Sequence, residues 1–305
     1  MSYAYHTADV FTDEPFGGNQ LAVLPHAEGL SDGQMQIIAR EFNFSETVFV
    51  LPPDDPANTR KLRIFTPGGE LPFAGHPTVG AAYVLARTGE IPLTGAETQI
   101  VFEEGSGPVP VLIRATDGAP TFSQLAAPRP PETREPGFDA RTIAAVVSLN
   151  VSDLDIDGEY AIEAVSVGVP FLLLPVRSLE ALGRARMNNE RWTETLKGSW
   201  APEVFLFTAS GSSVGGKEFR ARMFAPTMGI VEDPATGSAC ACLGAYLGTR
   251  SSITDGTEHY RVHQGVEMGR PSLLEVEADV SGGKVTAVRV GGASVLMSSG
   301  ILHVV

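Results

Sequence analysis

The chain has 305 residues, of which 43% are hydrophobic and 19% charged, so it can bury a core in each of two domains of ordinary size. The formal net charge of −14, with no cluster of Lys or Arg, argues against nucleic acid as a partner. The N-terminal residues do not resemble a signal peptide. The most apolar stretch, residues 161–176, contains Glu163 and Pro170 and predicts two short strands rather than a membrane span, so we expect a cytoplasmic protein.

Short hydrophobic segments separated by Gly, Pro, Asp and Asn predict strands in the first half of the chain. We expect these strands at residues 10–11, 21–24, 47–51, 61–65, 98–102 and 109–114. Ser31 and Gln34 are typical of a capping box, and they predict an amphipathic helix whose apolar positions are Met35, Ile37, Ile38 and Phe42. The Pro-rich segment 120–136 predicts a linker between two domains.

The second half repeats this pattern, with strands expected at residues 162–167, 171–176, 204–208 and 219–224. It also contains an echo of the first half, because His76-Pro77 and Asp233-Pro234 each follow a Phe-x-Pro segment and precede a small apolar segment. Residues 79–86 and 238–247 are apolar all round, which predicts helices buried on every side. The sequence therefore predicts an α+β fold of two pseudo-symmetric lobes, each a β-barrel-like sheet wrapped around a central helix.

His76-Pro77 and Asp233-Pro234 are expected to be the N-cap and first residue of these helices, because proline suits a position whose N–H would be unpaired. If the two halves face each other, the free N–H groups of both helix starts form an anion site for a carboxylate-bearing substrate. Taken singly, each residue also fits a structural role, Asp233 as a simple cap and His76 as a loop residue.

Five segments resemble the signature sequences of the PhzF (phenazine-biosynthesis) family. They are residues 9–12, 18–23, 45–47, 73–78 and 232–238, and they occur in the family's order. The resemblance implies the two-lobed diaminopimelate epimerase-like fold, a homodimer, and no metal or organic cofactor. Gln20 stands where many relatives have Pro, which affects loop rigidity rather than chemistry.

Carried over by position, the resemblance implies that Glu46 is the catalytic acid/base. It further implies that His76 and Asp233 assist it, and that the substrate is bound by Asn19, Ser45, Gly75, Gly237 and Ser238. The neighbours of Glu46, Phe42 to Phe49, are largely aromatic and aliphatic, so we expect them to desolvate its carboxylate and raise its pKa towards neutrality. On position alone, Glu46 also fits a surface residue at the start of a strand.

The related epimerases use two opposed cysteines, but Cys240 and Cys242 lie within one predicted helix and cannot face each other across a site. A single carboxylate that removes and returns a proton on one face favours an isomerisation. Three further segments partly match known motifs. Gly211–Lys217 matches the start of a phosphate-binding loop and residues 211–215 a nucleophile elbow, but the strand expected after them favours a hairpin loop. His259 and His263 lie four apart on an expected strand without a third metal ligand.

We expect residues 1–125 and 293–305 to form the first lobe, residues 126–292 the second, and the active site to lie in the cleft between them. Residues 294–305 should complete the first sheet. The expected function is that of a cofactor-independent isomerase that moves a proton on a small carboxylate-bearing substrate. Two alternatives stay open: an amino-acid epimerase or racemase that uses Glu46 with His76 or Asp233, and a non-catalytic small-acid-binding protein.

Overall fold

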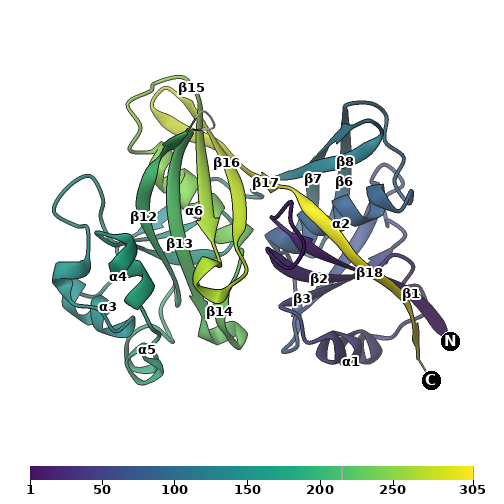
Figure 1. Ribbon diagram of the computed structural model, residues 1–305, viewed down its shortest axis with the longest axis horizontal. Helices are drawn as coiled ribbons and strands as arrows, with labels where there is room; N and C mark the ends of the chain where they lie inside the picture. Colours follow the sequence, from purple (N-terminus) through teal and green to yellow (C-terminus); the bar gives the residue numbers. More distant parts are fainter. Residues whose placement is uncertain (214–215, 305) are drawn as a thin grey trace. The chain divides into compact units, whose positions relative to one another are not determined.

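Each apolar repeat of the sequence forms a helix that lies inside its own sheet in the computed structural model (Figure 1). Residues 1–213 and 216–304 are described. They divide into unit 1, which comprises Met1–Ala126 and the residues from Gly291 onward, and unit 2, Ala127–Val290. Within the described part of the chain, no helix is long and apolar enough to cross a bilayer.

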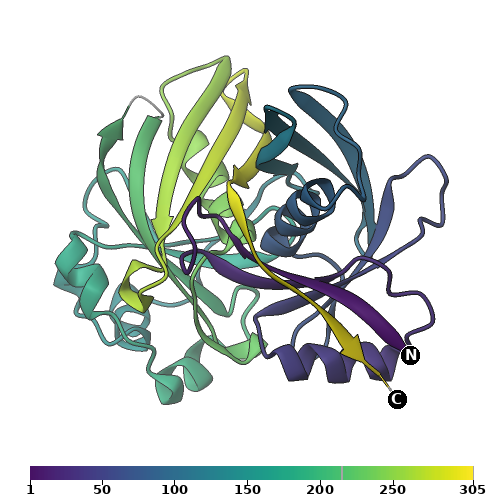
Figure 2. The same ribbon diagram turned by 45° about the vertical axis from the view of Figure 1, so that its right-hand side comes forward.

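The elements of unit 1 form a curled sheet around one helix, with a second helix outside (Figure 2). They are β1 (Ser2–Val10), β2 (Asn19–Leu24), α1 (Asp32–Phe42), β3 (Glu46–Leu51), β4 (Arg60–Phe65), β5 (Glu70–Leu71), α2 (Gly75–Arg87), β6 (Glu97–Glu104), β7 (Gly107–Thr116), β8 (Ala119–Ala126) and β18 (Ser294–His303). The sheet order is β18-β1-β2-β3-β4-β6-β7-β8, with β5 on β4. Residues 294–305 were expected to join this sheet, and β18 pairs antiparallel with β1.

Unit 2 contains a second curled sheet around α6. It also contains a group of short helices, α3, α4 and α5. Its elements are β9 (Glu132–Arg134), α3 (Ala140–Val146), η1 (Val151–Asp153), β10 (Glu163–Ser166), β11 (Pro170–Pro175), α4 (Leu179–Arg184), α5 (Asn189–Thr195), β12 (Glu203–Ser213), β13 (Gly216–Ala225), η2 (Pro226–Met228), β14 (Ile230–Asp233), α6 (Gly237–Gly248), β15 (Gly256–Gln264), η3 (Val266–Met268), β16 (Ser272–Ser281) and most of β17 (Lys284–Gly292), whose last two residues belong to unit 1. The sheet order is β9-β10-β11-β12-β13-β15-β16, with β14 on β13.

The strand pairings of the two units follow one pattern. In unit 1, β1-β2-β3-β4-β6-β7 alternate antiparallel, parallel, antiparallel, parallel and antiparallel. In unit 2, β10-β11-β12-β13-β15-β16 show the same alternation, with α6 in the place of α2. The internal echo seen in the sequence is therefore a repeat of topology, in which β3 corresponds to β12 and β6 to β15.

Glycine allows each central helix to approach its sheet. A Cβ atom on Gly80 in α2 would lie 2.5 Å from Leu21 Cδ2 and 2.6 Å from Val10 Cγ2. In α6, a Cβ on Gly244 would lie 2.5 Å from Val276 Cγ1. All three distances are too short for non-bonded carbon atoms, so a larger residue at either position would force neighbouring side chains to move.

Helix α1 agrees with the predicted start but not with every predicted apolar position. The capping box of α1 is present, with Ser31 Oγ accepting from Gln34 N and the Gln34 side chain accepting from Ser31 N. Ile37, however, is 64% exposed and does not belong to the buried face, which consists of Met35, Ile38 and Ala39. Two helical positions after Met35 point about 200° away from it, so an adjacent pair such as Ile37 and Ile38 straddles the edge of the apolar stripe.

The predicted linker at residues 120–136 is wrong for most of its length. Its first part is β8, which pairs with β7, and its last part contains β9, which pairs with β10. Ser123, Gln124 and Leu125 are all buried in β8, and Pro120 stands near the strand's start, where a missing N–H is tolerated. At the segment Gly211–Lys217, β12 and β13 pair antiparallel through Gly211 and Glu218. Val214 and Gly215, which belong to both motifs weighed there, lie outside the described residues.

Candidate active site

Glu46 is the first residue of β3 in unit 1, and it is 7% exposed. The preceding helix α1 ends at Phe42, and Asn43 reverses the chain with a left-handed φ of 53°. Asn tolerates this conformation better than most residues. β3 then pairs in parallel with β2, with Leu21 opposite Glu46. The buried Glu46 therefore agrees with the expected desolvated carboxylate and not with a surface residue.

Asn19 begins β2 on the same sheet face as Glu46, because it lies two residues before Leu21. The loop before it is fixed by the buried Asp9, whose Oδ2 accepts a hydrogen bond from Phe16 N at 2.8 Å. Gly18 has a φ of +61°, and a Cβ there would lie 2.3 Å from the Val10 carbonyl oxygen. The loop thus reaches Asn19 by a path open only to glycine at this position.

His76 lies in the first turn of α2 and is 4% exposed. The prediction that His76 is the N-cap was wrong. The helix begins at Gly75, and Ala74 is the cap. Pro77 is consequently the third helical residue. The prediction assumed that proline marks the first position, but all of the first four N–H groups of a helix lack helical partners, so proline is accommodated at the third as well.

His76 and Glu46 face each other in unit 1. His76 Nδ1 lies 3.4 Å from Glu46 Oε2 and 3.4 Å from Asn19 Nδ2. Burial lowers the pKa of His76 to about 3, opposed in part by a hydrogen bond with the backbone of Gln20. The imidazole is therefore neutral at physiological pH and supplies no positive charge to the carboxylate.

A neutral imidazole carries one ring proton, and this suits a neighbour that gains and loses a proton. With the proton on Nδ1, the ring can donate towards an ionised Glu46. With the proton on Nε2, Nδ1 can accept from the Asn19 amide or from a protonated Glu46. The three side chains can therefore accommodate Glu46 in both of its protonation states.

The second predicted group lies in unit 2 around Asp233, which is 5% exposed. Asp233 Oδ2 accepts from Thr236 Oγ1 at 2.5 Å. Gln264, fully buried at the end of β15, donates from Nε2 to the Asp233 carbonyl oxygen at 2.7 Å and to Thr236 Oγ1 at 3.0 Å. Its Oε1 accepts from Thr236 N at 3.1 Å. One amide side chain thus fixes the turn that connects β14 to α6.

Asp233 is not a helix N-cap either. It is the last residue of β14, paired with Met223 of β13, while α6 starts at Gly237 after the cap Thr236. The strand pairing keeps residue 233 extended, so the helix cannot begin at Pro234. His76 and Asp233 consequently occupy different positions relative to their helices, although the sequence echo aligned them.

The remaining predicted residues lie near these two groups. Ser45 directly precedes Glu46 and is partly exposed, and the buried Gly75 starts α2. Gly237, which is buried, and Ser238, which is partly exposed, form the start of α6. The structure brings together Glu46, His76 and Asn19 in unit 1, and Asp233, Gly237 and Ser238 along one turn in unit 2. Anion binding by the two helix starts stays a prediction.

The cysteines are packing residues. Cys240 and Cys242 are both fully buried within α6. Burial raises the pKa of Cys242 to about 12 and that of Cys240 well above its ordinary value. Thiols of this kind are not nucleophiles or bases at neutral pH.

Two buried side chains that organise the site regions escaped the sequence reasoning. Gln264 ends β15, and Glu104 ends β6, the corresponding strand of unit 1. A signal for Glu104 was present, because Thr98, Ile100, Phe102 and Glu104 share one period-two face and all are buried.

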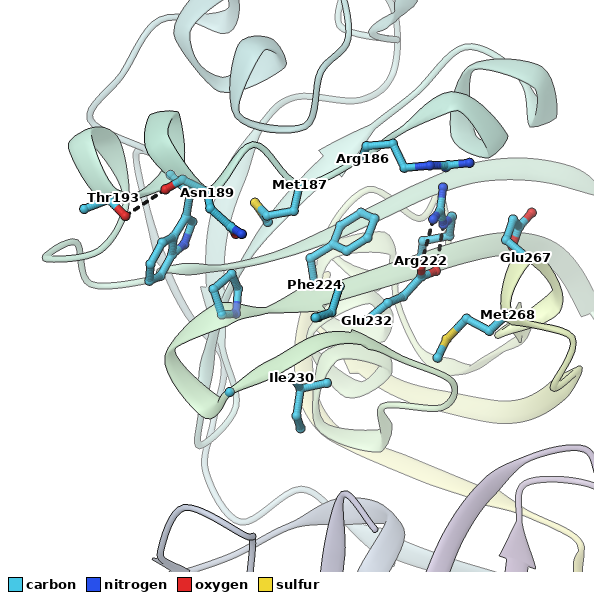
Figure 3. Close-up of a pocket in the computed structure, with 14 residues that line it drawn as sticks. Arg186, Met187, Asn189, Thr193, Arg222, Phe224, Ile230, Glu232, Glu267 and Met268 are labelled. Carbon is cyan, nitrogen blue, oxygen red and sulfur yellow. Dashed lines mark hydrogen bonds and ion pairs between the residues drawn. The ribbon is translucent and has the colours of Figure 1, made fainter. Parts of the chain in front are cut away.

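Unit 2 also has a cavity of about 680 Å³, shown in Figure 3. Its walls include Met187, Phe224, Ile230 and Met268. Arg222 reaches it but is engaged by both oxygens of Glu232 at 2.8 Å. Of the residues predicted for the site, the cavity's lining includes none within the described range. In that same range, no group of three or more His, Cys, Asp or Glu is arranged to hold a metal.

A family profile described as "Phenazine biosynthesis-like protein" matches residues 8–300. The chain belongs to the PhzF family. An uncharacterized isomerase of Mesorhizobium japonicum is 41% identical to this PhzF-family protein, and the match covers 98% of each chain. The trans-2,3-dihydro-3-hydroxyanthranilate isomerase of Pseudomonas aeruginosa is 33% identical, again over 98% of each.

The fold comparison leads to the same family. A PhzF-family phenazine biosynthesis protein of Bacillus anthracis, solved by crystallography, matches all of both chains with a TM-score of 0.88 and 27% identity. The predicted family, the α+β epimerase-like fold and the isomerase class are therefore confirmed.

Proposed function

We propose that this PhzF-family protein is a cofactor-independent isomerase that moves a proton between two carbons of a small carboxylate-bearing substrate, with Glu46 as the proton carrier. The observation that carries the proposal is the buried Glu46 carboxyl group 3.4 Å from a neutral, buried His76. Burial keeps bulk water away from this carboxyl group, and the neutral imidazole beside it can donate to or accept from it as it loses or gains a proton.

The proposed reaction needs no co-reactant, because a proton is removed and a proton is returned. The Glu46 carboxylate removes a proton from a substrate carbon, and the electrons of the broken C–H bond enter the conjugated system of the substrate. Glu46, now a carboxylic acid, returns the proton to another carbon of that system on the same face. His76 stays neutral and keeps its ring proton throughout, and with that proton on Nδ1 it can donate towards the Glu46 carboxylate before the proton is taken up and after it is returned.

The test uses trans-2,3-dihydro-3-hydroxyanthranilate, because the Pseudomonas aeruginosa relative is named for isomerising it. We expect Glu46→Gln to lower kcat by about two to four orders of magnitude, since the amide keeps the size of the side chain but cannot carry the proton. Glu41→Gln, at an exposed position near the end of α1, is the matched control and should keep wild-type kcat. Retained turnover in folded Glu46→Gln would remove this residue from the mechanism.

Reaction in deuterated water separates the isomerase from the epimerase alternative. An isomerase returns the proton to a different carbon, so solvent deuterium that exchanges with Glu46 should appear at the new position. An epimerase or racemase returns it to the original carbon with inverted configuration. A protein that binds the acid without turnover should show neither.

The roles of Asp233, Gly237 and Ser238 in the same reaction are part of this proposal, as is a homodimeric assembly. The buried Asp233 with its fixed turn supports the first. Asp233→Asn should lower kcat without unfolding the protein, because the amide oxygen can still accept from Thr236. Sedimentation equilibrium tests the dimer, and a single species of 32.2 kDa would contradict it.

A further inference from the structure

Glu104 is a buried carboxyl group that the proposed reaction does not use. It is the last residue of β6 in unit 1 and is 8% exposed. Its Oε1 lies 2.5 Å from Thr78 Oγ1, in the first turns of α2, two residues beyond His76.

The hydrogen bonds around Thr78 indicate which form Glu104 takes. Thr78 Oγ1 also lies 2.7 Å from the Ala74 carbonyl oxygen. Thr78 Oγ1 lies in donor position to both the Ala74 carbonyl oxygen and Glu104 Oε1, but a hydroxyl has one hydrogen and a carbonyl oxygen can only accept, so both contacts are satisfied together only when Thr78 donates to Ala74. The short contact between Thr78 and Glu104 then needs a proton from the other side, which a carboxylic acid has and a carboxylate lacks.

The surroundings favour the acid form. Burial raises the pKa of Glu104 to about 8, although hydrogen bonds with Thr78 and the Ala74 backbone partly oppose the shift. The charged groups that line the neighbouring cavity are Lys61 and Arg63 of β4, Glu70 of β5, Glu103 of β6, and Asp54 and Asp55. Lys61 is paired with Asp54, and Arg63 with Glu70 and Asp32, so both cations are already neutralised by other carboxylates.

The turn that follows Glu104 also holds the segment that enters α2. Ser106 N donates to the Pro72 carbonyl oxygen at 2.8 Å, and a Cβ on Gly105 would lie 2.9 Å from Pro72 Cα. Residues 104–106 therefore contact the chain on both sides of His76, at Pro72 and at Thr78.

Unit 2 shows the same device with a neutral side chain. Gln264 ends β15, the strand that corresponds to β6, and it holds the residues that lead into α6. A glutamine amide donates and accepts as a protonated glutamate does. The repeat thus contains the neutral counterpart of a protonated Glu104.

We propose that Glu104 is a positioning residue, which as a carboxylic acid locks the first turn of α2 and so keeps His76 in place beside Glu46. The inference rests on the proposed function of Glu46 and His76. When Glu104 ionises, Thr78 must turn its hydrogen from Ala74 towards the carboxylate, so that only the long backbone hydrogen bond from Thr78 N to the Ala74 carbonyl oxygen, at 3.4 Å, still closes the first turn.

Activity measured against pH provides the first test, with trans-2,3-dihydro-3-hydroxyanthranilate as the probe. Wild type should lose kcat as pH rises through about 8, whereas Glu104→Gln should keep kcat within about twofold at pH 7 and not show this loss. Glu104→Leu, which cannot donate, should lose kcat about tenfold with KM changed less than about threefold, because a small displacement of His76 affects the chemical step. Glu203→Gln, at a buried carboxyl of unit 2, is the control and should keep the wild-type pH profile.

The second test needs no substrate. With ¹⁵N-labelled histidine, the ring nitrogen signals of His76 should shift with a midpoint near pH 8 in wild type and stay constant from pH 6.5 to 9.5 in Glu104→Gln. His76 itself does not titrate in this range, since its pKa is about 3. Constant His76 signals in wild type, or the same alkaline loss of kcat in Glu104→Gln as in wild type, would overturn the proposal. If no turnover is seen in any variant but the signals shift, the proposed function fails while the positioning role stands.

Discussion

Buried ionisable side chains in this protein are held in two different ways. Arg222 keeps its charge, because the two oxygens of Glu232 and the carbonyl oxygens of Leu182 and Ala185 take up its donors. Glu104 and His76 lie where the neutral form is favoured. Arg222 is thus a buried charge with a full set of hydrogen-bond partners, whereas burial without such compensation favours the neutral form at Glu104 and His76.

Arg222 and Arg220 of β13 form a matched pair for measuring this difference. Arg222 is 3% exposed, whereas the Arg220 side chain is 23% exposed and pairs with Glu267. We expect Arg222→Leu to lower the free energy of unfolding by about 3–5 kcal/mol, because it leaves Glu232 and two carbonyl groups without their partner. Arg220→Leu should cost about 0–1 kcal/mol. Urea denaturation checks both, and equal losses would contradict the assignment.

At the scale of residues, the sequence pointed to three side chains that the structure brings together, but it misplaced the helix caps. Glu46, His76 and Asn19 could be predicted because the family motif marks them, and the structure brings them within contact distance. The N-cap assignments of His76 and Asp233 failed because proline is compatible with several positions of a first turn, and because pairing of Asp233 with Met223 is a long-range contact. Gln264 gave no signal, since a buried amide looks like any other polar residue at a strand end.

At the scale of elements, the two central helices depend on close contact with their sheets. Every residue of α2 from Gly75 to Ala86 is buried, and glycine at position 80 leaves room for Val10 and Leu21. Helix propensity favours alanine over glycine, so the glycine at position 80 is explained by close packing and not by propensity. The apolar composition of both helices made their burial predictable from sequence. β8 was taken for part of a linker because Pro120 stands near its start, and β16 was missed although buried apolar residues alternate with charged ones along it.

Replacing glycine by alanine should therefore lower the free energy of unfolding at position 80 and raise it at position 33. Gly80→Ala places a Cβ against two buried side chains, and we expect a loss of about 1–3 kcal/mol in the free energy of unfolding. Gly33→Ala, on the exposed side of α1 with no atom within 4 Å of the added Cβ, should gain up to about 1 kcal/mol from the higher helix propensity. Thermal unfolding of the two variants beside wild type checks the signs, and a stabilising Gly80→Ala would contradict the packing argument.

For the molecule as a whole, the buried carboxyls Glu104 of unit 1 and Glu203 of unit 2 should make stability fall as pH rises through the neutral range. Burial raises the pKa of Glu104 to about 8 and that of Glu203 to about 7, both above the ordinary 4.5. The unfolded chain releases these protons more readily, so stability falls as pH rises from about 4.5 to 8 and then levels off. The lowered pKa of His76 has the opposite effect, since stability is lost as pH falls from about 6.5 towards 3.

We expect the wild-type protein to lose stability between pH 5 and pH 8, by an amount on the order of 3–5 kcal/mol per raised carboxyl at most. The double variant Glu104→Gln, Glu203→Gln should lose much less over this range, because the amides stay neutral at every pH. Urea denaturation at four pH values between 5 and 9 measures the difference. Parallel curves for wild type and double variant would show that these two groups do not set the pH dependence.

The pairing of β1 with β18 has a consequence for the order in which the protein can be made. β1 lies between β2 and β18, and their register runs from Ser2 opposite His303 to Val10 opposite Ser294. During synthesis, unit 2 has all of its residues before β18 leaves the ribosome, while unit 1 still lacks a strand and presents one edge of β1 unpaired. Unit 2 is thus positioned to fold before unit 1 is complete, and until β18 has been synthesised the free edge of β1 can pair with strands of other chains.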